Sequence, residues 1–549
     1  MFEKKIGIIA PFYDSYQYQD EFHLRFRANN RQFTLASFHE LARKGYSTAN
    51  LSRGFSYEED LPSAGYYLEG LMRQQGYDTF LTSGYDPLTL QRVAEKNPMA
   101  ILVSTTMVLS VDGLLRIFSA IRKAMPGVTI IAGGVFIWKN YLSFCRYPDA
   151  ESPWDQLFRT DASSTEADIL IAAPHGRSSL LQVFDELNKG GRGSFDNIPN
   201  LVIPRNGKFI FTRREEEIVD YNTDFTRWDL VEKIVHKLPV RTSIGCPYRC
   251  AYCDFNKLFP KVFIRSAESI AAELQLAIER FGHNPAILHF SDDNLFLNRK
   301  RIQEICNVVM QSGFRKWMAF MRANDYTEDE YSLMERSGLM LAFIGVESGD
   351  QGQLDRMKKR QDVMKLKRTI ENLDAHFIST FNTFIVGYPG ETKESIQNTI
   401  RFLNELSLTH LTASYEAFLL RIHPLTDLTE PENRAKWGLK GYNQNWTHNT
   451  MNKDEALAGL YTLFKEVNNV PYHYAEESHF FNKALYSFEI KQSFFRLRHQ
   501  LTIKLIEQEP WQEVENLLKE MALILNLPVE GIDSSLQDEI IRPLGISGE

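Results

Sequence analysis

Three cysteines within eight residues form the segment of this sequence most able to do chemistry. Cys246, Cys250 and Cys253 have the spacing C-x3-C-x2-C, in a chain with five cysteines altogether. Thiolates this close favour a metal site over a disulfide framework. The same spacing would fit one face of a helix. Gly245 and Pro247 favour a loop or a helix start instead.

The number of ligands bears on which metal the three cysteines bind. Structural zinc normally takes four ligands with paired spacings, and no fourth Cys or His lies nearby in the sequence. Three thiolates suit a [4Fe–4S] cluster that leaves one iron open. An open iron can hold a substrate or cofactor, so we interpret the cysteines as catalytic metal ligands. A zinc site remains the second interpretation.

Alternating strands and helices surround the cysteines. Short apolar runs alternate with stretches of helical periodicity from about residue 238 to about residue 420. Repeated β/α units of this length predict a barrel or partial barrel with its active site at the carboxyl ends of the strands. The expected strands are 240–243, 287–290, 317–321, 341–346, 380–386 and 412–419.

The cysteine motif follows the first of these strands, and in this position it resembles that of the radical S-adenosylmethionine (SAM) enzymes. Tyr252, just before the last cysteine, also fits that family. The resemblance covers about residues 240–420. It implies that the reduced cluster cleaves SAM to a 5′-deoxyadenosyl radical, which abstracts hydrogen from an unactivated C–H bond.

Further segments agree with the resemblance in their order along the chain. Asp292 and Asp293 look like the acidic segment found in the cobalamin-linked branch, and Arg322 is the candidate partner of the methionine carboxylate. Glu347 and Ser348 resemble the ribose-contacting motif. Ile385 belongs to a stretch similar to the one whose backbone meets the adenine. Each also has an ordinary alternative, as a helix cap, a turn or a surface ion pair.

A second alternation precedes the barrel. Expected strands at 6–10, 79–82, 100–104, 128–132 and 168–173 predict a doubly wound parallel sheet, with insertions at 11–64 and about 139–166. A dinucleotide site would need G-x-G-x-x-G after the first strand, and that motif is missing there.

Small and hydroxyl residues follow three successive strands of this sheet and would let a bulky planar ligand approach the backbone. They resemble the cobalamin-binding domain of B12-dependent radical SAM enzymes. The D-x-H-x-x-G motif that supplies a cobalt ligand elsewhere is missing, since His23 follows Asp20 at the wrong spacing. The resemblance therefore implies water or no ligand on the lower cobalt face. A degenerate fold without cobalamin is the alternative. The candidate cobalamin contacts are Ser104, Thr105, Thr106, Gly133, Gly134, Val135, His175 and Gly176.

Composition sets limits on the class of protein. The chain has 549 residues, 43% of them apolar, and a net charge of −8. A negative net charge does not favour binding to nucleic acid or to an anionic membrane. No apolar run approaches the ~20 residues that a membrane-spanning helix needs. We expect a cytoplasmic α/β protein. Its expected parts are a Rossmann-like cobalamin-binding domain (1–190), a linker (191–237), a radical SAM partial barrel (238–423) and a mainly helical region (424–549).

Together these features predict a cobalamin-dependent radical SAM methyltransferase. The resemblance implies methyl transfer through methylcobalamin to an unactivated carbon, or a phosphinate phosphorus, of a small natural-product intermediate. It also implies a reducing partner such as flavodoxin or ferredoxin. A B12-dependent radical SAM cyclase or ring-rearranging enzyme is the first alternative, and a zinc-containing binding protein is the second.

Overall fold

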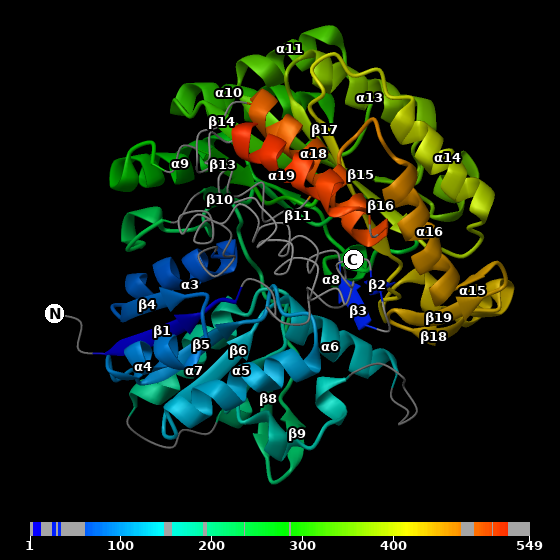
Figure 1. Ribbon diagram of the computed structural model, residues 1–549. Helices are drawn as coiled ribbons and strands as arrows, with labels where there is room; N and C mark the ends of the chain where they lie inside the picture. Colours follow the sequence, from blue (N-terminus) through cyan, green and yellow to red (C-terminus); the bar gives the residue numbers. More distant parts are fainter. Residues whose placement is uncertain are drawn as a thin grey trace.

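The computed structural model describes residues 4–11, 25–28, 31–34, 61–147, 156–189, 195–234, 237–284, 287–473, 488–507 and 509–524. Two sheets organise these residues (Figure 1). The first lies in the blue and cyan part of the chain, and the second lies above it in the green and yellow part. This is the α/β class that the sequence predicts.

The first sheet has seven strands in the order β4-β1-β5-β6-β7-β8-β9. Strands β4, β1, β5, β6 and β7 run parallel, as expected, and the hairpin β8–β9 adds two antiparallel strands. The region expected to be a linker therefore extends the sheet. The bounds are β1 Lys5–Ile9, β4 Asp78–Thr82, β5 Ala100–Ser104, β6 Thr129–Gly133, β7 Ile169–Ile171, β8 Leu201–Arg205 and β9 Lys208–Phe211.

Helices cover both faces of the first sheet, because its strands are apolar on both sides. Apolar residues of α4, α5 and α6 pack in one core with Ile9 and Ile101, and those of α3 and α7 pack in another with Ile6 and Ile8. The helices are α3 Ser63–Gln74, α4 Pro87–Ala94, α5 Val111–Ala124, α6 Val135–Arg146 and α7 Arg177–Asn188.

Helix α6 corrects one expectation. The sequence predicts an insertion at about 139–166, yet α6 begins directly after Gly134 and runs to Arg146. It lies between the sheet and a short helix of the other half, α8 (Phe255–Leu258), where Trp138 donates to the Leu258 carbonyl at 3.0 Å. Apolar residues do recur in α6 at helical spacing, at Ile137, Tyr141 and Phe144, and the expectation of an insertion overlooks this signal.

The second sheet has six parallel strands in sequence order, and its outer strands are β10 and β17. It therefore forms the expected partial barrel. The strands are β10 Leu238–Val240, β13 Ile287–Phe290, β14 Lys316–Met321, β15 Leu339–Glu347, β16 Ser379–Val386 and β17 Ala413–Leu419. Between them lie α9 Ala267–Phe281, α10 Arg299–Ser312, α11 Glu328–Arg336, α12 Gln351–Arg356, α13 Val363–Ala375 and α14 Lys393–Asn404.

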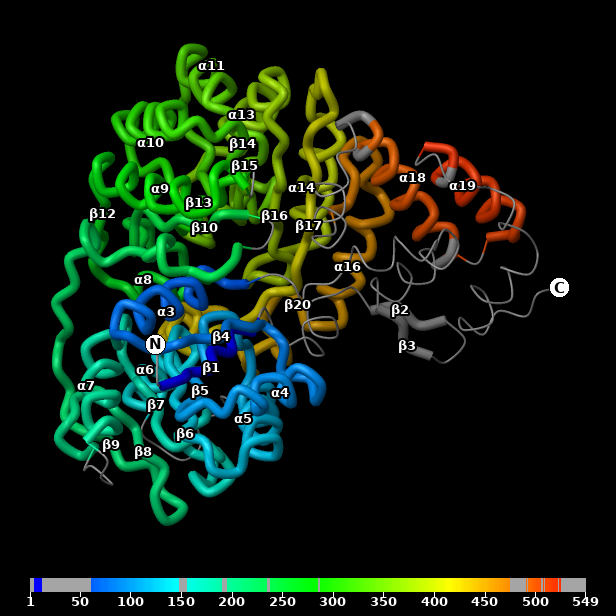
Figure 2. The backbone as a smooth tube through the Cα atoms, turned by 90° about the vertical axis from the view of Figure 1, so that its left-hand side faces the viewer, coloured from blue at the N-terminus to red at the C-terminus, as the bar shows by residue number. Residues whose placement is uncertain are grey.

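Smaller elements complete the described chain. Strands β11 (Ser243–Ile244) and β12 (Phe263–Ile264) pair as a hairpin, and the cysteine segment lies in the connection between them. Figures 1 and 2 place α18 beside α16, where His499 contacts the Phe464 carbonyl at 2.9 Å. The described residues contain no helix long and apolar enough for a membrane span. The remaining elements are β2 Arg25–Ala28, β3 Arg31–Thr34, α15 Pro431–Trp437, β18 Lys440–Tyr442, β19 Asn445–His448, β20 Met451–Asn452, α16 Lys453–Glu466, α18 Phe488–Glu507 and α19 Trp511–Ile524.

Candidate functional site

The cysteine segment is a loop between β11 and α8. It starts at Gly245, whose φ of +88° and close approach to the Lys261 carbonyl (a Cβ would lie 2.4 Å away) exclude a side chain. The loop is tied to the barrel by Ala251, whose N–H donates to the Met357 carbonyl at 2.8 Å. Cys250 is buried, and the other two thiols are half-buried.

The three thiols influence one another electrostatically. Burial raises the pKa of Cys246 and raises the pKa of Cys253 to about 12, and the charge of Cys250 contributes to both shifts. No three His, Cys, Asp or Glu side chains among the described residues converge on a point that could hold a single metal ion. A [4Fe–4S] cluster binds each thiolate through a different iron, so it needs no such convergence. The three cysteine thiols of this loop fit a cluster with one open iron.

Glu347 contacts the cysteine loop from the end of β15. Its Oε1 accepts from the Tyr252 hydroxyl at 2.8 Å and from the Lys359 ammonium at 2.9 Å, and all three side chains are largely buried. Glu347 has a φ of +69°, at a register shift where β15 pairs with β16. Left-handed backbone at a bulge re-aims a side chain, and here it directs the carboxylate toward the loop.

Arg322 lies beside the same loop, just after β14. Its guanidinium carbon is 3.8 Å from the centre of the Tyr248 ring, and its Nη1 is 3.8 Å from the Cys250 sulfur. Its Nη2 donates to the Lys359 carbonyl. The predicted carboxylate partner therefore stands next to the predicted cluster ligands.

The two aspartates after β13 have different surroundings. Asp292 is buried and accepts from the backbone N–H and hydroxyl of Thr242 and from the hydroxyl of Ser243, so its carboxylate holds the strand that leads to the cysteines. Asp293 lies 3.4 Å from Arg241, and burial raises its pKa to about 6. The charge of Asp293 also adds to the raised pKa of Cys246, so this carboxylate lies near the cysteine loop.

Ser348 and Ile385 lie in the barrel wall. The Ser348 hydroxyl is 3.3 Å from the Thr399 hydroxyl and accepts from the Asp350 N–H at 3.1 Å, so it is already hydrogen-bonded within the chain. Ile385 is half-buried on β16, opposite Phe418 of β17. Their roles as cofactor contacts stay predictions.

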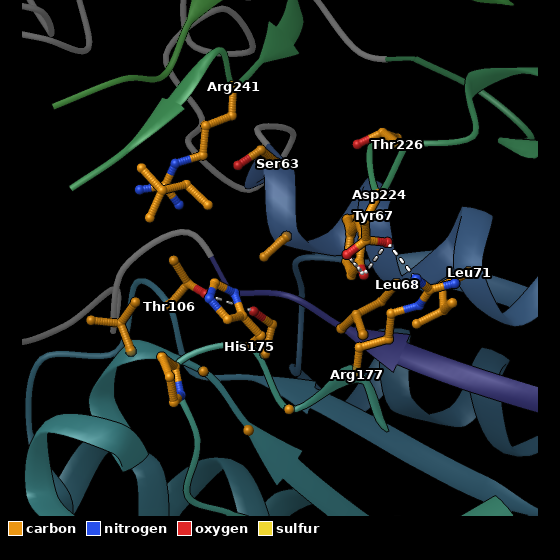
Figure 3. Close-up of a pocket in the computed structure, with 18 of the residues that line it drawn as sticks. Ser63, Tyr67, Leu68, Leu71, Thr106, His175, Arg177, Asp224, Thr226 and Arg241 are labelled. Atoms are coloured by element: carbon orange, nitrogen blue, oxygen red, sulfur yellow. Dashed lines mark hydrogen bonds and ion pairs between the residues drawn. The ribbon is translucent and has the colours of Figure 1, made fainter. Parts of the chain in front are cut away.

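A cavity lies between the carboxyl edge of the first sheet and the start of the barrel. It encloses about 260 Å³ within an open-mouthed space of about 1490 Å³. Arg241 reaches it from the barrel side, whereas Thr106 and His175 lie on the sheet side (Figure 3). Seven of the eight predicted cobalamin contacts line it: Ser104, Thr106, Gly133, Gly134, Val135, His175 and Gly176.

Thr105 is the one predicted contact outside the lining. Its hydroxyl donates to the Gly133 carbonyl at 3.0 Å, and its backbone N–H donates to the same carbonyl at 2.8 Å. Gly134 has a φ of +122°, and a Cβ there would lie 3.1 Å from the backbone nitrogens of Thr105 and Thr106. Thr105 therefore fixes a shallow cradle at Gly134, a position that favours glycine.

Sequence reasoning missed several polar groups that line the same cavity as the predicted contacts, namely Tyr67, Arg177, Tyr221 and Asp224. His175 bonds the Tyr221 hydroxyl, and burial lowers the His175 pKa to about 4, so the imidazole is neutral. Tyr67 donates to Asp224 at 3.0 Å, and Arg177 pairs with Asp224 at 3.0 Å. Asp20 and His23, considered above, lie outside the described residues.

A buried ionic cluster links the two halves next to the cysteine loop, and no pattern in the sequence predicts it. Lys139 of α6 lies 2.5 Å from Asp254 and 2.8 Å from Nδ1 of His423, which follows β17. Burial lowers the pKa of His423 to about 3, so this imidazole is neutral and accepts from Lys139. Burial alone would raise the pKa of Asp254, but the Lys139 charge lowers it overall.

Comparisons with known proteins agree with this geometry. The family model described as the radical SAM superfamily matches residues 240–403. Anaerobic magnesium-protoporphyrin IX monomethyl ester cyclase of Rubrivivax gelatinosus is 23% identical over 62% of this chain and 61% of its own length. Bacteriochlorophyllide d C-12(1)-methyltransferase of Chlorobaculum tepidum is 28% identical over 31% of this chain and 38% of its own length. The chain thus spans less than two thirds of these relatives.

Two solved structures share the fold. The cobalamin-dependent S-adenosylmethionine radical enzyme OxsB, with aqua-cobalamin bound, has a TM-score of 0.54 and 14% identity over 89% of this chain and 78% of that one. The radical S-adenosylmethionine methyltransferase TsrM from Kitasatospora setae, with cobalamin and a [4Fe–4S] cluster bound, has a TM-score of 0.50 and 15% identity. That match covers 68% of this chain and 72% of TsrM.

Proposed function

We propose that the chain is a cobalamin-dependent radical SAM methyltransferase, because the radical SAM superfamily model matches residues 240–403. Its cofactors would be a [4Fe–4S] cluster, SAM and cobalamin. The fold it shares with OxsB and TsrM, both solved with cobalamin, supports this proposal.

One observation carries the proposal. The cavity that Ser104, Gly133 and Gly134 line on the sheet side is closed on the other side by Arg241, Ser243 and Ile244. These barrel residues lead directly to Cys246, the first cluster ligand. A ligand bound at the sheet edge would therefore lie next to the cluster loop, as a two-cofactor reaction requires.

The cysteine loop would hold the cluster. When bound and reduced, a cluster of this kind supplies the electron that cleaves SAM to methionine and a 5′-deoxyadenosyl radical. The protein's part is to bind and orient SAM. Arg322 would bind its carboxylate, and Glu347, fixed by Tyr252 and Lys359, would accept from its ribose hydroxyls.

The carboxyl edge of the first sheet would hold cobalamin, which when bound acts as a carrier of the methyl group. Gly134 and Gly176 line this edge without side chains, so a planar ligand could approach the backbone there. Ser104 and Thr106 add hydroxyls at the same edge, 3.3 Å apart. The residues present thus fit the group.

The substrate would be a small molecule, a natural-product intermediate methylated at an unactivated carbon or a phosphinate phosphorus. A flavodoxin or ferredoxin would supply electrons. The test is anaerobic incubation with methyl-deuterated SAM, hydroxocobalamin and reductant, with and without small-molecule extracts. We expect 5′-deoxyadenosine, S-adenosylhomocysteine and a deuteromethylated product. The Cys250→Ala variant, which lacks a ligand, should give no 5′-deoxyadenosine.

A B12-dependent cyclase or ring-rearranging enzyme is the second candidate. The anaerobic magnesium-protoporphyrin IX monomethyl ester cyclase of Rubrivivax gelatinosus aligns over 62% of this chain, well beyond the barrel alone. In the same assay this function would give 5′-deoxyadenosine without S-adenosylhomocysteine and without deuteromethyl transfer. Either product pattern is clear-cut, because methylation consumes a second SAM.

A further inference from the structure

Strand β16 continues into a short loop, Gly387–Glu391, that follows the stretch at Ile385 predicted to meet the adenine of SAM. Gly387 and Gly390 have φ angles of +93° and +91°, so the chain turns sharply at both positions. A Cβ on Gly387 would lie 2.3 Å from the Trp446 ring. The shape of this loop therefore depends on the residues packed against it.

Helix α12 holds one side of the loop. The amide nitrogen of Gln353 donates to the Tyr388 carbonyl at 2.9 Å, and the Tyr388 hydroxyl donates to the Arg356 carbonyl at 3.2 Å. Helix α12 begins four residues after Glu347, the predicted ribose contact. This side of the loop is therefore joined to the predicted ribose end of the SAM site.

Strand β19, from the region after the barrel, holds the other side through His448. This residue is 7% exposed, and its Nε2 lies 3.0 Å from the Gly387 carbonyl oxygen. Because a carbonyl oxygen only accepts, Nε2 carries the hydrogen. Burial lowers the pKa of His448, so the ring is neutral and its Nδ1 is an acceptor.

Thr450 extends this contact to the far end of the loop. Its hydroxyl lies 3.1 Å from Nδ1 of His448 and donates to it, and its oxygen accepts from the Gly390 N–H at 3.2 Å. One imidazole and one hydroxyl therefore connect the Gly387 carbonyl to the Gly390 N–H. Both glycines at which the loop turns are held by the same pair of side chains.

Trp446 fixes the His448 ring in turn. The two rings stack with their centres 5.2 Å apart and their planes 11° apart. The indole N–H donates to the Leu420 carbonyl at 2.9 Å, directly after β17. The imidazole is therefore held in the orientation in which it donates to Gly387.

We propose that His448 is a positioning residue for SAM, which holds the loop after β16 in the shape that binds the adenine. This inference rests on the proposed function, since it concerns the SAM site of that reaction. The small sheet of β18, β19 and β20 would then serve SAM binding, although it lies outside the barrel sequence. His448 acts through the backbone of the loop, so its loss should weaken SAM binding and leave the iron content unchanged.

The test is calorimetric titration of the anaerobically purified, cluster-containing chain with SAM. His448→Phe keeps a ring that can stack on Trp446 but cannot donate to Gly387, so we expect the SAM dissociation constant to rise about tenfold. His448→Gln offers an amide N–H to that carbonyl and an amide oxygen to Thr450, so it should restore most of the affinity. Thr450→Val changes an exposed side chain with little risk to folding, and it should weaken SAM about threefold.

His499→Phe is the matched control. His499 is also a buried histidine, its Nε2 lies 2.9 Å from the Phe464 carbonyl, and its ring centre lies 4.4 Å from that of Phe464. Its bond joins α18 to α16 rather than to the loop. We expect His499→Phe to lower stability about as much as His448→Phe does and to leave SAM affinity unchanged.

Three results would overturn the proposal. They are unchanged SAM affinity in both His448→Phe and Thr450→Val, equal weakening by His499→Phe, and no recovery in His448→Gln. Failure of the proposed function would look different, because the unaltered chain would then hold its cluster without binding SAM, and this inference would fall with it.

Discussion

The ammonium of Lys139 lies 2.5 Å from the carboxylate of Asp254, the residue that follows the last cysteine of the loop. Lys139 belongs to α6, which begins directly after Gly134 at the edge of the first sheet. The pair therefore joins the candidate cluster loop to the candidate cobalamin edge. Both side chains are mostly buried, with 19% and 13% exposed.

Breaking this pair should destabilise the protein. Lys139→Met leaves the Asp254 carboxylate buried without its cation, and we expect a loss of about 3 kcal/mol in the free energy of unfolding. Iron per chain should also fall, because Asp254 adjoins Cys253. Denaturant unfolding and iron analysis measure the two effects. Lys261→Met, which breaks the exposed pair with Glu216, is the control and should change neither.

The double variant Lys139→Met/Asp254→Asn sharpens this prediction. Removing both charges leaves no unpaired ion, so its stability should exceed that of Lys139→Met alone. If the stability losses of Lys139→Met and Asp254→Asn simply added in the double variant, the two residues would not be energetically coupled as described here.

Glu347→Gln should weaken SAM binding without loss of the cluster. The Tyr252 and Lys359 contacts both end on Oε1, and the proposed role of the carboxylate is to accept from ribose hydroxyls. We expect the SAM dissociation constant to rise about tenfold while iron per chain is unchanged. Lys359→Met breaks the ion pair but keeps the carboxylate. Equal weakening by both variants would mean that Glu347 acts only through the ion pair.

Gly134→Ala should reduce both stability and cobalamin binding. The alanine would have to keep the backbone φ of +122°. Its Cβ would lie 3.1 Å from the backbone nitrogens of Thr105 and Thr106. Strain of this kind costs about 1–3 kcal/mol. Cobalt retained per folded chain measures the effect on binding. Gly127→Ala, at a site with no atom within 4 Å, should be neutral. Full cobalt retention in Gly134→Ala would argue against a cradle at this edge.

Glu391 should make stability depend on pH. Burial raises its pKa to about 8, from an ordinary value of 4.5. The folded state then holds a proton that the unfolded state has released, so stability should fall as pH rises from about 4.5 to about 8. Glu391→Gln should remove on the order of 2–4 kcal/mol of this decline. Denaturant unfolding at several pH values tests it, with the exposed Glu394→Gln as control; an unchanged slope in Glu391→Gln would contradict it.

Much of the fold could be predicted because its elements repeat simple patterns. Strands β5 and β13 have the bounds expected from their apolar runs, and the candidate residues follow successive strands in the expected order. The confirmed α/β class follows from that alternation. The prediction fails at α6, whose apolar residues at helical spacing fall in the segment expected to be an insertion.

The partners of polar side chains are harder to predict, because these contacts depend on how segments distant in the sequence pack together. Lys359 belongs to a basic run that suggests a surface turn, yet it is buried against Glu347. Asp292 and Asp293 are neighbours in the sequence. Only the structure shows that the hydroxyls of Thr242 and Ser243 donate to the Asp292 carboxylate. Lys139 and His423 are 284 residues apart, beyond any local signal.

The most direct test of the central claim is the iron and cobalt content per chain after anaerobic purification with iron, sulfide and hydroxocobalamin supplied. We predict about four irons and one cobalt for the unaltered chain. Cys246→Ala should lose the iron and keep the cobalt, and Cys306→Ala, a buried cysteine outside the loop, should keep both. Four irons without cobalt would contradict the cobalamin-dependent methyl transfer proposed here, and stoichiometric zinc with little iron would contradict the radical mechanism itself.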